Sequence, residues 1–150
     1  MNMLTPKKLK YRKAFKGRNV GRATSGDNLA FANYGIKMLE NINLKSNTFE
    51  AAYKVLNKSV KSYSKVWFRA FPHKPVTKKP IEVRMGKGKG AVDHYVACVK
   101  SGNLIFEFDA PSWSDVERVT AQCSAKIGRK CKAIMREVGG VFSGSDIYEN

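Results

Sequence analysis

Residues 91–109 read AVDHYVACVKSGNLIFEFD, two runs rich in β-branched, aromatic and aliphatic residues that are separated by Ser101 and Gly102. This composition favours strands, and a serine-glycine pair is a typical short connection between antiparallel strands. The sequence therefore predicts strands at 91–100 and 103–109 that pair with each other as a hairpin.

Two segments flanking this pair predict helices. The first, residues 48–62, carries apolar side chains at helical spacing: Phe49, Tyr53, Leu56, Val60 and Tyr63. Asn47 lies where an N-cap would lie, and Glu50 follows three residues later, as in a capping box. We interpret Phe49 and Tyr53 as core residues rather than as platforms for stacking.

The second helix follows the predicted hairpin. Ser112 or Ser114 can cap it, and Gly128 can end it. Its apolar face is formed by four residues at helical spacing: Val116, Val119, Cys123 and Ile127. The helix is therefore expected to pack on the sheet through this face.

The remaining segments predict further strands at 29–39, 65–71, 81–85 and 132–137. Pro72, Pro75 and Pro80 exclude a helix between two of them and indicate an extended connection. A chain of 150 residues suits one domain with a real core. Two helices with mostly antiparallel strands predict an α+β fold. We divide the chain into a basic extension (1–26), an α+β domain (27–137) and a tail (138–150).

The charge of the chain is large and unevenly distributed. The formal net charge is +16, from 28 Lys and Arg against 12 Asp and Glu. Residues 1–26 hold eight basic residues and no acid, residues 58–90 hold ten against Glu82, and residues 91–150 hold seven against eight acids. Such segregation favours an oriented contact with a polyanion. Nucleic acid is the first expectation, and an anionic membrane surface is the second.

Targeting segments and membrane spans are not evident in the sequence. No apolar run approaches the length needed to cross a bilayer, and the start of the chain lacks the apolar core of a signal peptide. We therefore expect a soluble protein that works in the compartment where it is made, with no membrane partner.

The basic extension has few large apolar side chains, so it is expected to order only against its partner, or else to be a plain disordered tail. Its cations are expected to neutralise phosphates, while Tyr11, Phe15 and Trp67 could stack on exposed bases. Zinc fingers, basic zippers and recognition-helix pairs are missing from the sequence. RNA, recognised by shape and backbone, is therefore favoured over DNA.

The segment Arg84-Met85-Gly86-Lys87-Gly88-Lys89-Gly90 alternates glycines with lysines and could lie against phosphates. It does not match a mononucleotide P-loop, which needs a second glycine five positions after the first and then Lys and Ser or Thr. A dinucleotide fingerprint would need a helix next, whereas a predicted strand follows. The loop is therefore expected to contact an RNA backbone.

Enzyme chemistry finds little support. His73 and His94 are the only histidines, and Asp93 beside His94 is expected to lie on the opposite face of the strand. Glu107 and Asp109 share a face and are interpreted as salt-bridge partners for surrounding lysines. Three cysteines, Cys98, Cys123 and Cys131, lack the spacing of zinc ligands and are interpreted as reduced, buried thiols. We predict no catalytic residues, no metal and no cofactor.

Several stretches together resemble the large-subunit ribosomal protein L-sixteen family of bacteria and organelles. The match runs over about residues 3–137 and is densest from KVWFRAFP at 65–72 to EVRMGKGKG at 82–90. Shorter stretches also match: PKK at 6–8, YRK at 11–13, KGRN at 16–19, YGIK at 34–37, EAA at 50–52 and IFEFD at 105–109.

This resemblance implies a hammerhead-type α+β domain that helps to shape ribosomal RNA and position tRNA without catalysing a reaction. The implied partners are large-subunit rRNA, tRNA and other ribosomal proteins, with no homo-oligomer. The residues that would enter rRNA are Lys7, Lys8, Lys10, Arg12, Lys13, Lys16, Arg18 and Arg22. The loop from Arg84 to Gly90 would reach the acceptor arms of tRNA near the aminoacyl site and the peptidyl-transferase centre.

The chain also departs from the family pattern. The first helix carries Phe49, Tyr53, Lys54 and Lys58 where bacterial members have arginines, and Ile127-Gly128-Arg129 replaces the usual Leu-Pro. Lysine in place of arginine favours an organelle-encoded copy in a mitochondrial ribosome, with a plastid or bacterial ribosome as the alternative. A free RNA-binding regulatory protein is the alternative function.

Overall fold

The computed structural model describes residues 4–136, and this part of the chain contains two helices and seven strands. The helices are α1 (Ser46–Val60) and α2 (Trp113–Ile127). The strands are β1 (Tyr34–Met38), β2 (Ile42–Lys45), β3 (Trp67–Phe68), β4 (Lys74–Lys78), β5 (Ala91–Val99), β6 (Leu104–Phe108) and β7 (Cys131–Met135). The predicted α+β class is confirmed, while the predicted tail, 138–150, lies outside the described residues.

The strands form two antiparallel sheets. The order in one sheet is β3-β6-β1-β7, and the order in the other is β2-β5-β4. All five side chains of β6 are buried, which places this strand inside the molecule on both faces. β6 is therefore an inner strand of the four-stranded sheet, between β3 and β1, and the core lies on both of its faces.

The predicted hairpin between 91–100 and 103–109 is wrong, because β5 and β6 belong to different sheets. The tight turn does exist: Asn103 N–H donates to the carbonyl of Lys100 at 3.1 Å, and Gly102 has a φ of 95°. Within this turn, however, Gly102 N–H donates to the carbonyl of Met38 in β1 and not to β5. The two strands diverge because each pairs with other strands on both of its edges.

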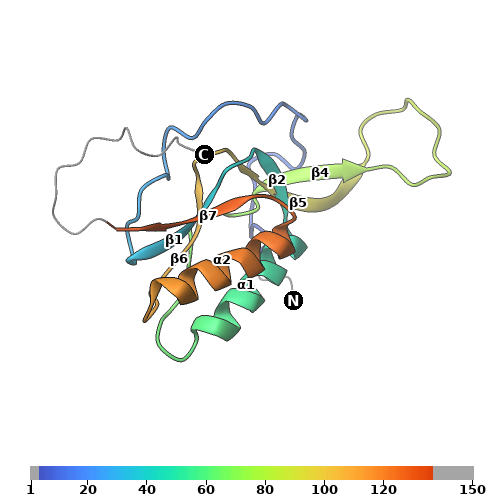
Figure 1. Cartoon of the computed structure of the whole chain (residues 1–150). Coiled ribbons are helices and arrows are strands. Elements are labelled where there is room, and N and C mark those ends of the chain that lie inside the picture. Colours follow the sequence, from blue (N-terminus) through green and yellow to red (C-terminus); the bar gives the residue numbers. More distant parts are fainter. Residues whose placement is uncertain (1–3, 137–150) are drawn as a thin grey trace.

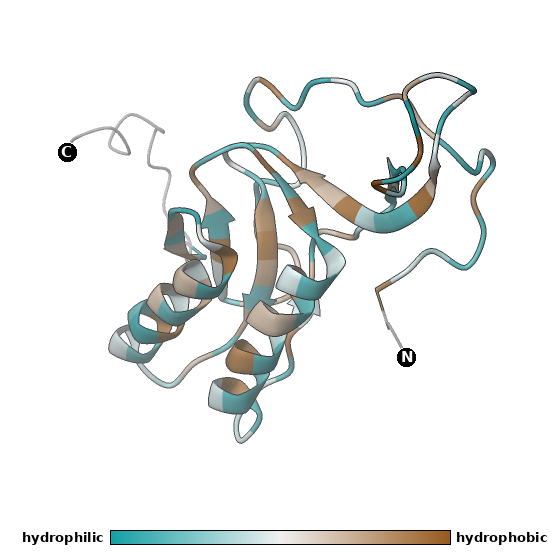
Figure 2. Cartoon of the chain, turned by 90° about the vertical axis from the view of Figure 1, so that its right-hand side faces the viewer, coloured by the Kyte–Doolittle hydropathy of each residue, from teal (hydrophilic) through white to brown (hydrophobic). Residues whose placement is uncertain are grey.

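The two helices lie side by side and cover one face of the four-stranded sheet (Figure 1, Figure 2). In the core, the ring centroids of Phe49 and Phe106 are 4.8 Å apart, and at its edge those of the partly buried Tyr53 and of Phe68 are 4.6 Å apart. Offset aromatic pairs at such distances add to the stabilisation from buried area. The interpretation of Phe49 and Tyr53 as core residues is confirmed.

The two predicted helix caps have different outcomes. At the start of α2, Ser112 Oγ accepts a hydrogen bond from Asp115 N–H at 3.2 Å, and Gly128 ends the helix in the left-handed region, as predicted. The capping box at Asn47 is wrong, because α1 already begins at Ser46 and no side chain caps it. Glu50 instead pairs with Lys54 one turn later, at 3.1 Å.

The segment between α1 and β5 differs most from expectation. Only Trp67–Phe68 of the predicted strand 65–71 is a strand, and 81–85 contains none. The extended connection instead contains β4, which pairs with β5 along one edge. Pro75 fits there because β4 is an edge strand and needs no second row of hydrogen bonds. At the two ends of the domain, β1 and β7 fall within or one residue from the predicted strands 29–39 and 132–137.

β4 and β5 continue outward as a two-stranded arm, and residues 79–90 form the loop at its end (Figure 1). The arm carries this loop well away from the helices. The fold therefore presents the glycine-lysine segment as a projection on a firmly packed domain.

Candidate nucleic-acid interface

The described part of the basic extension, residues 4–26, runs along the domain without forming a helix. Leu4 is buried in the core, and Asn19 Nδ2 donates to the carbonyls of both Ile42 and Val99 at 2.9 Å. Further along, Ala23 N–H donates to Ser101 at 2.8 Å. The expectation that this segment orders only against a partner is therefore wrong for these residues, since side-chain and backbone anchors fix it to the domain.

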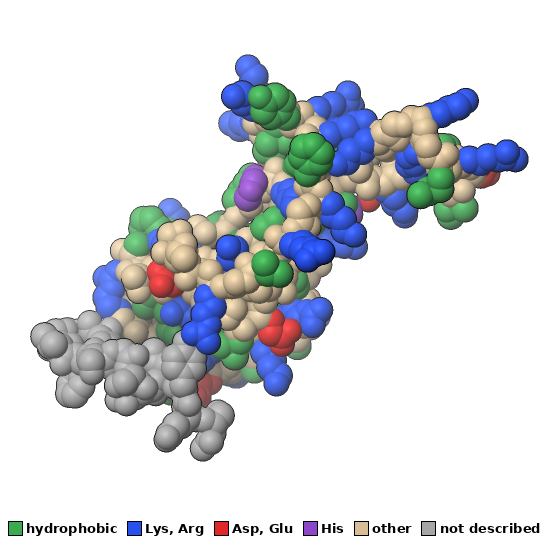
Figure 3. All heavy atoms as spheres, turned by 90° about the horizontal axis from the view of Figure 1, so that it is seen from above, with side chains coloured by type: hydrophobic (Ala, Val, Ile, Leu, Met, Phe, Trp, Pro, Cys, Tyr) green, Lys and Arg blue, Asp and Glu red, His purple; other side chains and the backbone are tan. Residues whose placement is uncertain are grey.

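The cations that were predicted to bind rRNA all lie on the surface. Each of these eight side chains is exposed: Lys7, Lys8, Lys10, Arg12, Lys13, Lys16, Arg18 and Arg22. Seen from above in Figure 3, lysine and arginine side chains gather along the projecting part of the molecule. The backbone of the extension is anchored and its charges are exposed, as expected for a surface that binds phosphates.

The glycine-lysine loop has the backbone that its composition predicts. Gly86 and Gly88 have φ of 97° and 86°, and Lys87 between them also has a positive φ of 51°. Residues 84–89 are exposed, and Gly90 is half-buried. A Cβ on Gly90 would lie 2.7 Å from the carbonyl oxygen of Lys78, so glycine is required for this close approach.

The extension and the loop, about 75 positions apart in sequence, contact each other directly. Lys13 Nζ donates to the carbonyl of Lys89 at 2.8 Å, and Lys89 Nζ donates in return to the carbonyl of Ala14. The Lys89 ammonium also lies 5.9 Å from the ring centroid of Phe15. The fold thus brings the two predicted binding segments together into one cationic surface.

The predicted stacking residues divide into two kinds. Tyr11 and Phe15 are 71% and 94% exposed. Trp67 instead stacks on Phe31, with ring centroids 6.5 Å apart and planes 11° apart. Tyr11 and Phe15 therefore keep open faces toward solvent, whereas one face of Trp67 is covered by the protein.

The expectation that Asp93 and His94 do not meet is wrong. His94 Nδ1 lies 2.8 Å from Asp93 Oδ2. The register of β4 against β5 shifts between Val76 and Thr77, opposite Asp93, and such an irregularity disturbs the regular alternation of neighbouring side chains. The hydrogen bond from His94 is the main reason that the pKa of Asp93 is lowered, and nearby lysines contribute to the same shift.

The prediction that Glu107 in β6 and Asp109 just after it pair with surface lysines is wrong. Glu107 is fully buried and forms an ion pair with Arg69. Asp109 accepts a hydrogen bond from Asn33 N–H at 2.9 Å. A lone acid in an otherwise apolar strand was the signal in the sequence for a buried structural carboxylate.

The thiols are not joined in disulfides. Cys123 is buried, while Cys98 and Cys131 are half-buried. Burial raises the pKa of Cys123 to about 12 and that of Cys131 to about 11. Within residues 4–136, no group of three or more His, Cys, Asp or Glu side chains could hold a metal ion.

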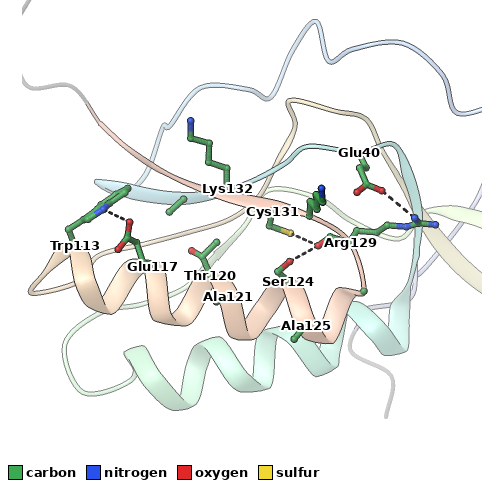
Figure 4. Close-up of a pocket in the computed structure, with 13 residues that line it drawn as sticks. Glu40, Trp113, Glu117, Thr120, Ala121, Ser124, Ala125, Arg129, Cys131 and Lys132 are labelled. Carbon is green, nitrogen blue, oxygen red and sulfur yellow. Dashed lines mark hydrogen bonds and ion pairs between the residues drawn. The ribbon is translucent and has the colours of Figure 1, made fainter. Parts of the chain in front are cut away.

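A large hollow, of about 850 Å³, lies between α2 and β7 on another part of the molecule (Figure 4). Its acids are already engaged: Glu117 accepts from Trp113 Nε1 at 2.8 Å, and Glu40 pairs with Arg129 at 3.2 Å. None of the residues predicted to bind RNA lines it. The candidate interface is therefore the surface shared by the extension and the arm.

Comparison with known proteins finds similarity over most of the chain. Residues 6–134 match the family model described as Ribosomal protein L16p/L10e. The chain is 45% identical over 141 residues to the large ribosomal subunit protein uL16 of a Sulfurihydrogenibium species, which covers 94% of this chain and 99% of that protein. Among the described residues, neither helix is long and apolar enough to cross a membrane.

Proposed function

Since this chain belongs to the Ribosomal protein L16p/L10e family and is a structural constituent of the large ribosomal subunit, we propose that its extension binds large-subunit rRNA. We also propose that the loop at the end of its arm contacts tRNA. The observation that carries the proposal is the direct contact between extension and loop, at Lys13, Ala14 and Lys89.

The proposed rRNA contacts are the exposed cations of residues 7–22. They lie on a backbone that Asn19 and Ala23 anchor to the domain. An anchored chain loses less conformational entropy on binding than a free one does, so more of the phosphate attraction is retained as affinity. Sequence-independent phosphate contacts also explain why the charges face outward without a groove-reading helix.

The proposed tRNA contact is the loop from Arg84 to Gly90. Its glycines leave the backbone uncovered, and Lys87 stands between two of them at the outer end of the arm. A narrow projection of this kind can enter between RNA segments where a helix cannot. We propose that it reaches bound tRNA near the aminoacyl site and the peptidyl-transferase centre.

The tRNA contact is tested with the double variant Arg84→Glu and Lys87→Glu, which changes two exposed cations of the loop and keeps Lys89, the residue that contacts the extension. Reconstituted large subunits that carry it should bind tRNA at least about tenfold more weakly than those with the unaltered protein, because two attractions to phosphate become repulsions. Lys126→Glu with Lys130→Glu is a control with the same change in net charge near the end of α2. An equal loss of tRNA binding in both double variants would contradict the proposal.

The alternative to a ribosomal function is that of a free RNA-binding regulatory protein, which would need the same positively charged surface. The two differ in where the protein is found. In lysates sedimented at low salt, the ribosomal function requires the chain in the large-subunit fraction. Its absence from that fraction, with the chain recovered on free RNA, would favour the regulator.

We further propose that the ribosome is mitochondrial, with a plastid or bacterial ribosome as the alternative. The support is the preference for lysine, since the chain has 20 lysines and 8 arginines. Fractionation of the source cells tests this proposal. Recovery of the chain in ribosomes outside mitochondria would contradict it.

A further inference from the structure

A second hollow, which we name the extension pocket, lies where the extension crosses the base of the arm. Its volume is about 450 Å³, within the range of about 300–1,000 Å³ that holds small ligands. Five segments line it: the extension, β2, β4, β5 and the inner end of the loop. None of its lining residues is an acid.

The rim of the extension pocket is cationic. Lys16, Lys45, Lys74 and Lys89 line it together with His94. Positive charges gathered on one rim attract an anion, and the carboxylate beside them is that of Asp93, which lies 2.8 Å from His94 Nδ1. The arrangement therefore indicates an anionic ligand.

Two of these lysines are positioned by the extension backbone. Lys74 Nζ donates to the carbonyl of Lys16 at 2.5 Å, and Lys89 Nζ donates to that of Ala14. An ammonium group has three N–H donors, so each lysine can bond a backbone carbonyl and still offer donors to a ligand oxygen. The extension thus holds the cations at the rim instead of merely adding charge.

The wall of the pocket is apolar. Val76 and Val96 line it from the sheet, and Phe15 lines it from the extension. Phe15 is 94% exposed, and the Lys89 ammonium is 5.9 Å from its ring centroid, so most of the ring is open to a ligand. A flat, open aromatic ring beside paired cations matches the two halves of a nucleotide, the base and the phosphate.

We propose that the extension pocket takes one unstacked nucleotide of an RNA chain, with its base against Phe15 and its phosphate between Lys74 and Lys89. This inference rests on the proposed rRNA binding and makes it more specific. It also assigns a role to Lys45 and His94, which line the pocket from β2 and β5. An acidic peptide would satisfy the cations, but it has no flat ring to cover Phe15.

The test uses the full chain and two fluorescent probes, a ten-residue oligouridylate and the same sugar-phosphate strand without bases. Phe15→Ala should weaken binding of oligouridylate by about tenfold, the loss of one stacked base, and should change binding of the abasic strand by less than about twofold. Lys74→Gln should weaken both probes by more than the control Lys126→Gln does. Thermal unfolding of each variant checks that the fold is intact.

Three outcomes would overturn the inference: equal effects of Phe15→Ala on both probes, equal effects of the two lysine variants, or competition by polyglutamate as strong as by oligouridylate. Failure of the proposed function looks different. In that case the unaltered chain itself would bind neither probe and would be missing from the large subunit, whereas failure of the pocket alone leaves both properties intact.

Discussion

Arg69 and Glu107 form an ion pair inside the molecule, with Arg69 Nη1 3.1 Å from Glu107 Oε1. The other carboxylate oxygen, Oε2, accepts hydrogen bonds from three consecutive backbone N–H groups, those of Ala30, Phe31 and Ala32, at 3.1, 2.7 and 3.1 Å. One carboxylate therefore joins β6, the segment after β3 and the stretch that leads from the extension into β1. It fixes the place where the basic extension leaves the domain.

Removing this carboxylate should be strongly destabilising. Glu107→Ala leaves the Arg69 charge and three backbone N–H groups, of which that of Ala32 is buried, without their partner. The expected loss is about 3–5 kcal/mol in the free energy of unfolding. Urea denaturation measures it. Glu50→Ala, which breaks only the surface pair with Lys54, should change stability by less than about 0.5 kcal/mol. Similar values for the two variants would contradict the structural role of Glu107.

A second prediction concerns how much the N-terminal residues of α1 and α2 contribute to stability. Ser112→Ala removes an observed cap and should lower stability by about 1 kcal/mol, whereas Asn47→Ala removes no cap and should be nearly neutral. Both are measured by the midpoint of urea denaturation at an unchanged slope. A larger effect at Asn47 than at Ser112 would restore the capping box that the sequence predicts.

Stability should also fall at high pH because of Cys123. Its pKa is about 12 when folded and 9.0 for an ordinary thiol, so its contribution to stability is complete below pH 9 and is lost as the pH rises toward 12. In that window the unfolded chain binds fewer protons, and the slope reaches up to about 1.4 kcal/mol per pH unit. Cys123→Val, which cannot ionise, should show a shallower decline between pH 9 and 11. An unchanged slope would contradict the raised pKa.

Local patterns predicted some parts of this fold well. α2 was predictable because its cap, its apolar face and Gly128 all act within a few residues. The α+β class followed from the same kind of signal. The partner of β5 was not predictable, because the turn at 101–102 has the same local chemistry whether its two strands pair or diverge. Pairing with β2 and β4 is decided by residues far away in sequence.

In the candidate site, too, local features were predictable from the sequence and long-range contacts were not. The exposed cations and the glycine backbone of the loop were readable from composition, since charge and positive φ are local properties. The contact between Lys13 and Lys89, and the convergence of Lys45, Lys74 and His94 on the extension pocket, depend on how the extension crosses the arm. The partners of Glu107 were not predictable for the same reason, since they lie 38 and about 76 positions away, although its place in an apolar strand was a local signal of burial.

The most direct test of the central claim is a map of protein-RNA crosslinks within intact large ribosomal subunits from the source cells. The account predicts crosslinks from the extension, residues 7–22, and from the loop, residues 84–90, to RNA segments that are adjacent in the particle, and few from lysines of α2 such as Lys126. Crosslinks concentrated on the helices, with the extension and the loop unmodified, would contradict it.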